Sequence, residues 1–418
     1  MTRQQTGPLY FGWYIVAAAT TITLLTVGMR MGIGPFFKPI AEDLGLSRTT
    51  LSTIVALGML AYGIGMPVAG FLAQKYGSRA VLLLGTAIVV ISSIWSVNAT
   101  DPFSFFLAFG ILLSLGVLLH QSSGVDAGDQ PVVHAPARQG AVLSVHRLHG
   151  GHRRDDTAAD LYERYGWQHT LTGFTVLFVL LVIPAALMII RDEAPEHTDL
   201  LPGDSAGGKS APPLAPLAQL TSLAAMRTLP FCKIALGLFA CGFSMNLLGS
   251  HGVPMLTDHG FDPITAALGI GLIGLVAIPS TLVLGHLADQ VPRRNLLAAI
   301  YLIRGLGFIG LMMVPSVWYL YAVAAVGGIV WAGSIALSSA ILADVYGIRS
   351  VGVLYGWAYL GHQVGAMISS WLGGWGYETF GTHWVAFGSA AAILMVAGVV
   401  SLRLPDARFF PQAQPSRA

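Results

Sequence analysis

The chain carries very little charge for its length, since only 10% of its 418 residues are Asp, Glu, Lys or Arg. Soluble domains contain about 25% charged residues, whereas 54% of this chain is hydrophobic. One soluble core could not bury so many apolar side chains, so the composition predicts an integral membrane protein. The net charge of +2 includes no basic block and gives no indication of a nucleic-acid partner.

Cysteine is also scarce. The two cysteines, Cys232 and Cys241, share one apolar run, and nine helical residues would separate them by about 13 Å. That distance is too long for a disulfide bond. We expect no cleavable signal peptide, because the first apolar run is long and no small-residue cleavage site follows it.

Eleven apolar runs approach the length of about 20 residues that a membrane span needs. Five precede residue 191 and six follow residue 231. The expected spans are 11–34, 49–73, 80–98, 103–119, 168–190, 232–256, 264–287, 295–314, 317–342, 351–375 and 383–403. Segment 191–230 is rich in Pro, Gly, Ser and Ala without apolar periodicity, which predicts a linker between two helix bundles.

The distribution of Lys and Arg predicts the orientation in the membrane. Basic residues fall in the linker, the tail and one set of turns, as Lys75, Arg79, Arg191, Lys209, Arg227, Arg293, Arg294, Arg349, Arg403 and Arg408. The opposite turns hold Asp101, Asp258, Asp262 and Glu378, with few bases apart from Lys38 and Arg48. We therefore expect a multi-pass protein of the plasma (inner) membrane with both termini and the linker in the cytoplasm.

This orientation requires an even number of spans before the linker, but only five are visible. The missing span should lie in the polar, histidine-rich segment 118–162. A reading-frame slip is the simplest explanation, because one permitted back-translation, read one nucleotide later, gives a basic turn and a complete apolar span. A divergent loop with a poorly apolar span is the alternative.

Two other motifs are set aside. Gly203–Ser210 fits a phosphate-binding loop, but Pro202 and Pro212 prevent the required strand and helix. His146, His149 and His152 have a spacing that suits a metal site, but two glycines interrupt their helix. We expect no cofactor and no metal.

Two short basic turns point to an internal duplication. Gly70–Arg79 reads GFLAQKYGSR, and Gly285–Arg294 reads GHLADQVPRR at the corresponding place in the second half. Both resemble the loop between helices two and three of the major facilitator superfamily, G-x-L-a-D-[RK]-x-G-[RK]-[RK]. The matching residues are Gly70, Leu72, Ala73, Lys75, Gly77 and Arg79, and then Gly285, Leu287, Ala288, Asp289, Arg293 and Arg294. The copies depart from the motif at Gln74 and Pro292, which weakens one conformational latch in each half.

Other stretches narrow the resemblance. FGWYIVAAA near the N-terminus, residues 28–48, 250–263 and 352–374 are similar to the monocarboxylate-transporter and oxalate/formate-antiporter branch. The resemblance implies an all-α major facilitator fold of twelve helices in two six-helix bundles, a binding site between them, and alternating access. Monocarboxylate transporters carry an Asp and a substrate-binding Arg where this chain has Gly274 and Ile278, so the usual carboxylate partner is missing.

Ionisable and polar residues inside the spans are the candidate site residues, because burying them in a membrane costs several kcal/mol. The predicted substrate-binding residues are Arg30, Asn246, His251, His362 and Gln363. Arg30 would attract an anion, unless it extends to the outer interface, and the histidines are equally consistent with interhelical hydrogen bonds. Arg304 is predicted to be a structural charge. No Asp or Glu stands in the middle of a span, which leaves a histidine, or a proton carried with the substrate, for any proton coupling.

These observations predict an N-terminal bundle at 1–190, a linker at 191–230, a C-terminal bundle at 231–404 and a tail at 405–418. The predicted function is secondary active transport of a small organic anion, with a carboxylate favoured, by a monomer with a proton as candidate co-substrate. Two alternatives remain: an exporter of an uncharged amphipathic metabolite or drug, and an inactive or sensor-like product if the 118–162 frame is genuine. Nothing in the sequence supports an enzyme.

Overall fold

The computed structural model describes residues 12–122, 158–189 and 220–405, and within these ranges the chain forms helices and no strands. The helices are α1 Gly12–Met31, α2 Ile33–Asp43, α3 Arg48–Tyr76, α4 Ser78–Val97, α5 Pro102–Phe105, η1 Phe106–Leu112, α6 Leu113–Ser122, α8 Ala158–Met188, α9 Ser222–Met226, α10 Leu229–Asp258, α11 Pro263–Gln290, α12 Arg293–Met312, α13 Val317–Ile329, α14 Gly333–Tyr346, α15 Ile348–Phe380 and α16 Trp384–Ser401. Among the described residues, nine helical stretches are long and apolar enough to cross a membrane. The predicted all-α membrane fold is therefore confirmed.

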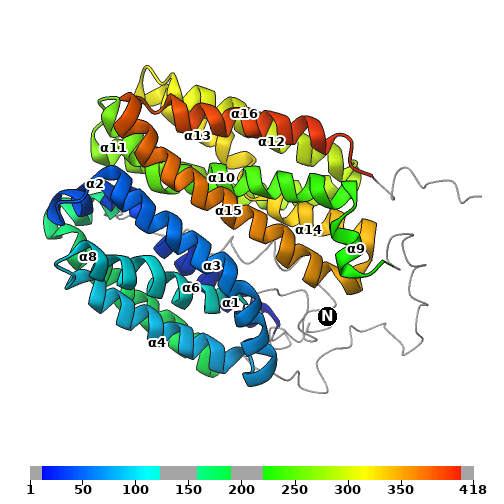
Figure 1. Cartoon of the computed structure of the whole chain (residues 1–418), viewed down its shortest axis with the longest axis horizontal. Coiled ribbons are helices and arrows are strands. Elements are labelled where there is room, and N and C mark those ends of the chain that lie inside the picture. The colour runs from blue at the N-terminus through cyan, green and yellow to red at the C-terminus, as the bar shows by residue number, and fades with distance from the viewer. Residues whose placement is uncertain (1–11, 123–157, 190–219, 406–418) are drawn as a thin grey trace, which may run out of the picture.

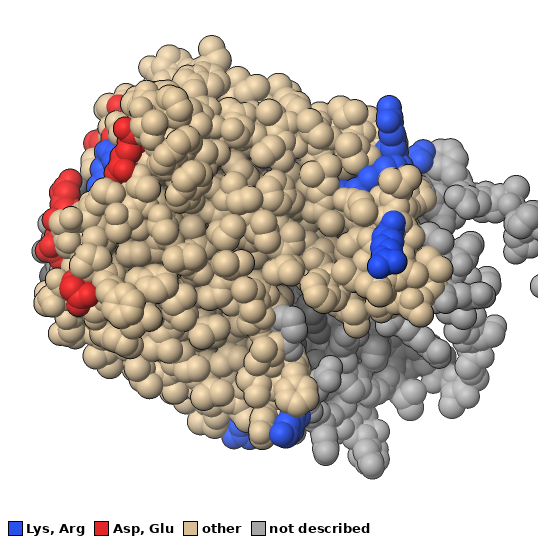
Figure 2. All heavy atoms as spheres, viewed as in Figure 1, with Lys and Arg blue, Asp and Glu red and all other residues tan. Residues whose placement is uncertain are grey.

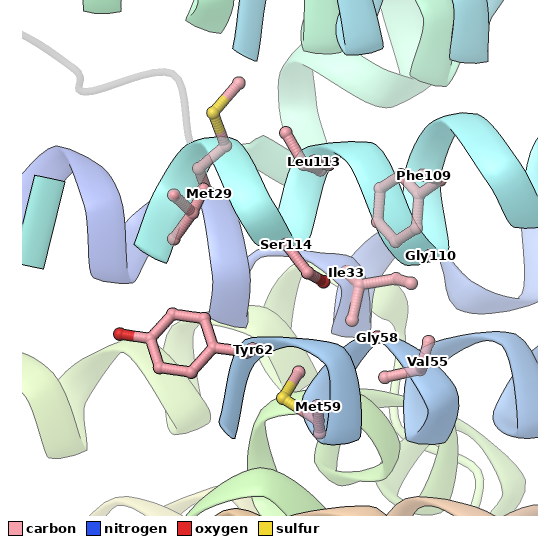
Figure 3. A pocket seen from close by; sticks show the side chains of 11 residues that line it. Met29, Ile33, Val55, Gly58, Met59, Tyr62, Phe109, Gly110, Leu113 and Ser114 are labelled. Atoms are coloured by element: carbon pink, nitrogen blue, oxygen red, sulfur yellow. The ribbon is translucent and has the colours of Figure 1, made fainter. Parts of the chain in front are cut away.

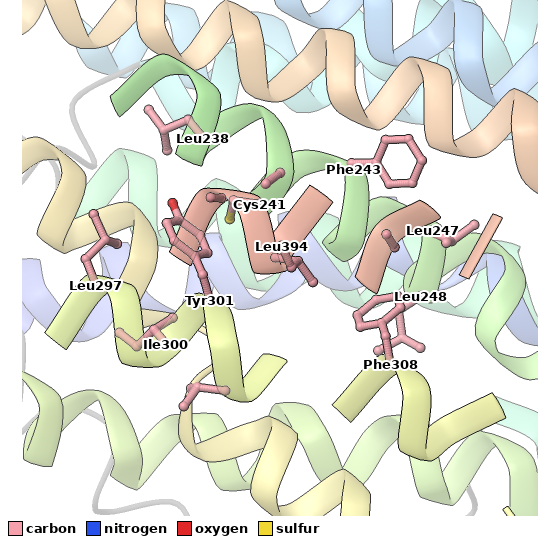
Figure 4. Packing of buried hydrophobic residues seen from close by; sticks show 14 of the residues in the cluster. Leu238, Cys241, Phe243, Leu247, Leu248, Leu297, Ile300, Tyr301, Phe308 and Leu394 are labelled. Carbon is pink, nitrogen blue, oxygen red and sulfur yellow. The ribbon is translucent and has the colours of Figure 1, made fainter. Parts of the chain in front are cut away.

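The helices form two halves that lie side by side (Figure 1), α1–α8 and α10–α16. Each half has an apolar core, and Tyr359 of α15 also belongs to the core of the N-terminal half. In the C-terminal half, side chains of α10, α12 and α16 interdigitate around Tyr301, Phe308 and Leu394, all nearly inaccessible to solvent (Figure 4). Burial of such side chains against neighbouring helices fixes each half as a unit.

Two of the expected spans are interrupted. The first divides at Gly32 into α1 and α2, and the stretch predicted at 317–342 divides at residues 330–332 into α13 and α14. At Gly32 the backbone N–H still donates to the Gly28 carbonyl oxygen at 2.8 Å. The second break leaves backbone carbonyls without intrahelical partners, which a membrane protein must satisfy from elsewhere. The apolar pattern does not show either break.

The two ends of the molecule differ in charge (Figure 2). The acidic end comprises the turns between α2 and α3, α4 and α5, α10 and α11, and α15 and α16, with Asp101, Asp258, Asp262 and Glu378 together with Lys38 and Arg48. The basic end comprises the turns between α3 and α4, α11 and α12, and α14 and α15, with Lys75, Arg79, Arg293 and Arg294.

The segment interpreted as frame-shifted, 118–162, lies mostly outside the described residues. Its described start continues α6, where His120 is buried and lies 3.0 Å from the Thr86 hydroxyl on α4. Thr86 belongs to the basic half of α4, whereas Trp167 contacts Asp43 at the acidic end. The first described range therefore ends at Ser122, in the basic half of the molecule. The helical stretch that follows Gly166 starts at the acidic end.

Candidate functional site

The boundary between the halves is formed largely by α3 and α15, which run antiparallel. A Cβ added at Gly374 would meet the Arg48 carbonyl oxygen at 2.6 Å and Ser52, and one added at Gly63 would meet the Gln363 Cβ at 2.8 Å. Only glycine permits helices to approach so closely. The acidic end and the middle of this crossing are therefore tightly closed.

Toward the basic end, the glycines of the same two helices make no such close contact among the described residues. Continuing the register of the Gly63–Gln363 contact along α3 and α15 places Gly70 opposite Gly356. Within the ranges that the structure describes, a Cβ added at either glycine would have no atom within 4 Å. The close backbone contacts of this crossing therefore lie at its acidic end and middle, whereas toward the basic end α15 meets the N-terminal half through Tyr355 and Tyr359, which pack against the apolar core of that half.

A second close approach joins α2 of the first half to α10 of the second. A Cβ added at Gly34 would lie 2.5 Å from the Gly249 carbonyl oxygen. This contact and the α3–α15 crossing flank the same acidic end, so closure there involves two helix pairs.

The carboxylate of Asp258, the last residue of α10, interacts with three basic side chains. Lys38 Nζ lies 2.7 Å from Oδ1, and Arg48 donates from Nη1 to Oδ2 at 2.5 Å and from Nη2 to Oδ1 at 3.1 Å. His383 Nε2 lies 2.9 Å from Oδ2. Burial lowers the pKa of His383, and the Asp258 carboxylate opposes this shift. Because a carboxylate oxygen accepts, the Nε2–H of His383 donates to Asp258. Lys38 and Arg48 thus join the N-terminal half to the C-terminal half.

A second carboxylate of the C-terminal half lies on the N-terminus of α3. Glu378 accepts a hydrogen bond of 3.1 Å from the Thr49 backbone N–H and another from the Thr49 hydroxyl. A helix N-terminus carries partial positive charge and favours an anion. Arg48 also stacks over Tyr377 at 4.1 Å, so the first turn of α3 contacts α15 through charge, hydrogen bonds and an aromatic ring.

His251 lies in the next layer inward. Its Nε2 is 3.0 Å from the Ser370 carbonyl oxygen and 3.2 Å from the Ser52 hydroxyl, and its ring contacts Phe37 at 4.8 Å between centroids. The side chain is 2% exposed. Because Nε2–H donates to a carbonyl of α15 beside a hydroxyl of α3, the predicted site residue His251 belongs to the closed contact between the halves.

Three other predicted site residues lie deeper along α15. Asn246 donates from Nδ2 to the Ala366 carbonyl oxygen at 2.9 Å, which joins α10 to α15. His362 is stacked on Tyr359 with centroids 4.7 Å apart, and Gln363 is buried against Gly63 of α3. The structure therefore brings Asn246, His362 and Gln363 to the centre of α15, about one and a half to two helical turns from the level of His251.

The side chain of Arg30, the predicted anion partner, lies outside what the structure describes, although its backbone belongs to α1. A cavity of about 30 Å³ opens next to this part of α1, lined mainly by apolar side chains of α1, α2, α3, η1 and α6 around Ser114 and Tyr62 (Figure 3). A volume of this size holds a water molecule or two. The cavity is too small for an organic anion in the conformation described.

Arg304 on α12 donates hydrogen bonds to the backbone carbonyl oxygens at the break between α13 and α14. It donates from Nη2 to the Val330 carbonyl oxygen at 2.8 Å, to the Trp331 carbonyl oxygen and to the Ser334 hydroxyl at 3.3 Å. Its guanidinium also lies 5.1 Å from the Trp331 ring centroid. The side chain is 2% exposed, and no carboxylate among the described residues contacts it. A buried positive charge therefore holds an interrupted helix in place.

We expect Arg304→Gln to lower the free energy of unfolding by about 2–3 kcal/mol, because buried carbonyls at the helix break lose a charged donor. Thermal unfolding of detergent-solubilised protein would measure the loss. Arg294→Gln is the matched control, since Arg294 donates to the Leu404 carbonyl oxygen at the basic end. Equal melting temperatures for the two variants would contradict this role.

The two predicted latch loops differ in their contacts. Gly77 joins α3 directly to α4 with φ of +83°, a conformation that favours glycine, and Lys75 and Arg79 are exposed. In the second loop Arg293 forms an ion pair of 2.7 Å with Asp344 on α14, while Gly285 and Asp289 are exposed. Asp344 lies in the last turn of α14, and its partner Arg293 is 51 residues away in sequence.

Comparison with known proteins extends this description. The sequence model of the Major Facilitator Superfamily matches residues 19–125, 158–317 and 234–417. Human Monocarboxylate transporter 11 is 27% identical over 432 aligned residues, covering 97% of this chain and 86% of that protein. Rat Monocarboxylate transporter 13 is 22% identical over 401 residues, covering 94% and 89%. The uncharacterized MFS-type transporter YcxA of Bacillus subtilis (strain 168) is 22% identical over 378 residues, covering 87% of each chain.

The family match spans both halves of the chain, and these relatives cover nearly its whole length. Members of this family are transporters, which are not a class of enzymes. The chain is therefore a multi-pass membrane transporter that belongs to the Major Facilitator Superfamily, in its monocarboxylate-transporter branch.

Proposed function

We propose that the chain transports a small organic anion, with a carboxylate favoured, by alternating access. The observation that carries this proposal is the asymmetry of the boundary between the halves. Ion pairs and close glycine contacts join the halves at the acidic end, whereas toward the basic end they meet through the side chains of Tyr355 and Tyr359, with no described atom within 4 Å of a Cβ added at Gly70 or Gly356. Two rigid halves that close alternately at either end are the usual basis of alternating access.

Three observations support an anion as the substrate. Arg304 is a buried cation without a carboxylate partner among the described residues, and Arg30 is carried by α1 next to the small cavity. Relatives along nearly the whole chain are named monocarboxylate transporters. The buried charge of Arg304 gives the C-terminal half a positive potential, which would favour an anionic substrate over a neutral one.

The proposed orientation places the basic end in the cytoplasm, following the excess of Lys and Arg there. The protein then lies in the plasma (inner) membrane as a monomer with cytoplasmic termini, and the conformation described is closed to the outside. A proton is a candidate co-substrate, with His251 and His362 as the buried histidines of the boundary.

Uptake of a panel of labelled acids into proteoliposomes tests this function. We expect formate, acetate, pyruvate, oxalate or benzoate to enter faster than into empty vesicles, and an imposed proton gradient to drive uptake if a proton is carried along. Absence of uptake and of efflux for the whole panel would overturn the proposal.

A second candidate, export of an uncharged amphipathic metabolite, is favoured by Gly274 and Ile278, which replace the usual carboxylate-binding pair. Arg30→Ala separates the two candidates. Loss of transport confined to anions supports the first, and unchanged transport of a neutral amphipathic compound supports the second.

The third reading, an inactive or sensor-like product, depends on segment 118–162. Resequencing the coding DNA from codon 110 to codon 170 tests it directly. Two compensating single-base errors would restore the missing span, whereas an unchanged frame together with an absence of transport would support this reading.

A further inference from the structure

We propose that Lys38 and Arg48 form an entry site for the carboxylate of the substrate, and that Asp258 occupies this site whenever the acidic end is closed. The inference rests on the proposed function and adds a location and a mechanism for the first contact with substrate. On opening, the substrate carboxylate takes the place of the Asp258 side chain.

The closed conformation already contains a carboxylate bound at this site. Arg48 holds Asp258 by two hydrogen bonds, at 2.5 and 3.1 Å, and Lys38 adds a third at 2.7 Å. A guanidinium that donates two parallel hydrogen bonds is the standard partner for a carboxylate. The geometry of Lys38 and Arg48 therefore suits a carboxylate without any rearrangement of the N-terminal half.

Both cations belong to the N-terminal half, whereas the carboxylate belongs to the C-terminal half. When the halves part at the acidic end, Lys38 and Arg48 stay together on α2 and α3 and lose Asp258. They line a surface hollow of about 350 Å³ together with Ala41, Glu42, Gly45 and Leu46. The hollow thus carries two cations and one carboxylate, and the N-terminus of α3 adds partial positive charge.

Asp258 is also poorly placed without these cations. It is the last residue of α10, where the partial negative charge of a helix C-terminus disfavours a carboxylate. Its remaining neighbour after opening would be His383, at 2.9 Å from Oδ2 in the same half. Opening therefore costs two strong ion pairs, and an anion arriving at Lys38 and Arg48 compensates for part of that cost. Substrate and Asp258 compete for one site.

If Asp258 and the substrate compete for one site, removal of the Asp258 charge should strengthen substrate binding. Asp258→Asn should lower the KM for external uptake several-fold, because the internal competitor is lost and the binding-competent state becomes more populated. Asp262→Asn is the matched control. Asp262 lies in the same half and at the same end, but its carboxylate caps α11 by accepting a hydrogen bond from Thr265 N–H, a role that Asn also fills.

A double variant separates a binding site from a closure contact. In the Asp258→Asn background the ion pair is already broken, so a residue that only closes the end should have no further effect. We expect Arg48→Gln in that background to raise the external KM at least tenfold, in keeping with the loss of a charged hydrogen-bonding partner. In the same background, Arg48→Lys should recover part of the affinity, because lysine keeps the positive charge but lacks the two parallel N–H donors of the guanidinium.

The assay is initial uptake into intact cells of the labelled acid that the wild-type protein transports best, corrected for the amount of folded protein. An unchanged KM on adding Arg48→Gln to Asp258→Asn, while uptake continues, would overturn the entry site and leave the proposed function intact. Absence of uptake of every acid by the wild-type protein would overturn both.

Discussion

Oxidation of the double variant Ser52→Cys/Gly374→Cys should abolish transport, and reduction should restore it. A Cβ added at Gly374 would lie 2.7 Å from the Ser52 Cβ and 2.6 Å from the Arg48 carbonyl oxygen, so the two helices must move apart by about 1 Å to reach the Cβ–Cβ distance of about 3.8 Å in disulfides. The covalent bond would link α3 to α15 across the two halves. Because each transport cycle requires the acidic end to open, we expect residual transport below about one tenth of the reduced protein.

The native Cys232 and Cys241 are replaced by serine in this experiment, since Cys232 is exposed and free to form other disulfides. The two single variants, oxidised in the same way, measure any effect of crowding at the crossing. The pair Thr49→Cys/Glu378→Cys tests the same end without altering a glycine. Full transport by protein shown to be cross-linked would contradict alternating closure at this end.

Gly242→Leu should prevent most of the protein from folding. An added Cβ at Gly242 would overlap the backbone carbonyl of His362, where α10 packs against α15. A backbone atom cannot move aside as the end of a side chain can, so we expect a loss of at least about 3 kcal/mol, at or above the upper end of the usual cost of overpacking. Size-exclusion chromatography of detergent extracts would measure the fraction of monodisperse protein.

Gly271→Leu is the control for this substitution. Gly271 is a helical glycine of the neighbouring α11, and an added Cβ there would have no atom of the described part of the chain within 4 Å. Both variants place the same side chain in a membrane helix, so their difference isolates the contact with α15. Similar yields of folded protein would mean that α10 and α15 tolerate separation.

Much of the fold could be predicted from the sequence, because apolar runs of span length and positively charged turns are local features. The two basic loops at Gly70–Arg79 and Gly285–Arg294 also gave the family, since their spacing repeats. The breaks at Gly32 and at residues 330–332 could not be predicted, because no change in apolar character marks them. Arg304 is the only trace of the second break, and its carbonyl partners lie 26 and 27 residues away in sequence.

The site was harder to predict for a similar reason. Arg48 and Asp258 are 210 residues apart, and nothing local connects them. The sequence does contain a signal for this ion pair. Lys38 and Arg48 are the basic residues among otherwise acidic turns, and basic and acidic side chains gathered at one end of the molecule predict ion pairs between them. His251 was predicted to bind substrate, and this stays a prediction. The structure places its ring between Ser52 of one half and Ser370 of the other.

The tight contact at Gly63 and Gln363 divides α3 into two lever arms of unequal length. Ser52 lies 11 residues from Gly63 and Gly70 lies seven, which correspond to about 16 Å and about 10 Å along the helix axis. If the halves rock about this contact as rigid bodies, one rotation separates the Ser52 level about one and a half times as far as it separates the Gly70 level. The acidic end would then open wider than the basic end. The same substrate molecule would fit less tightly in the opening at the acidic end, where Lys38 and Arg48 lie, than in the opening at the basic end.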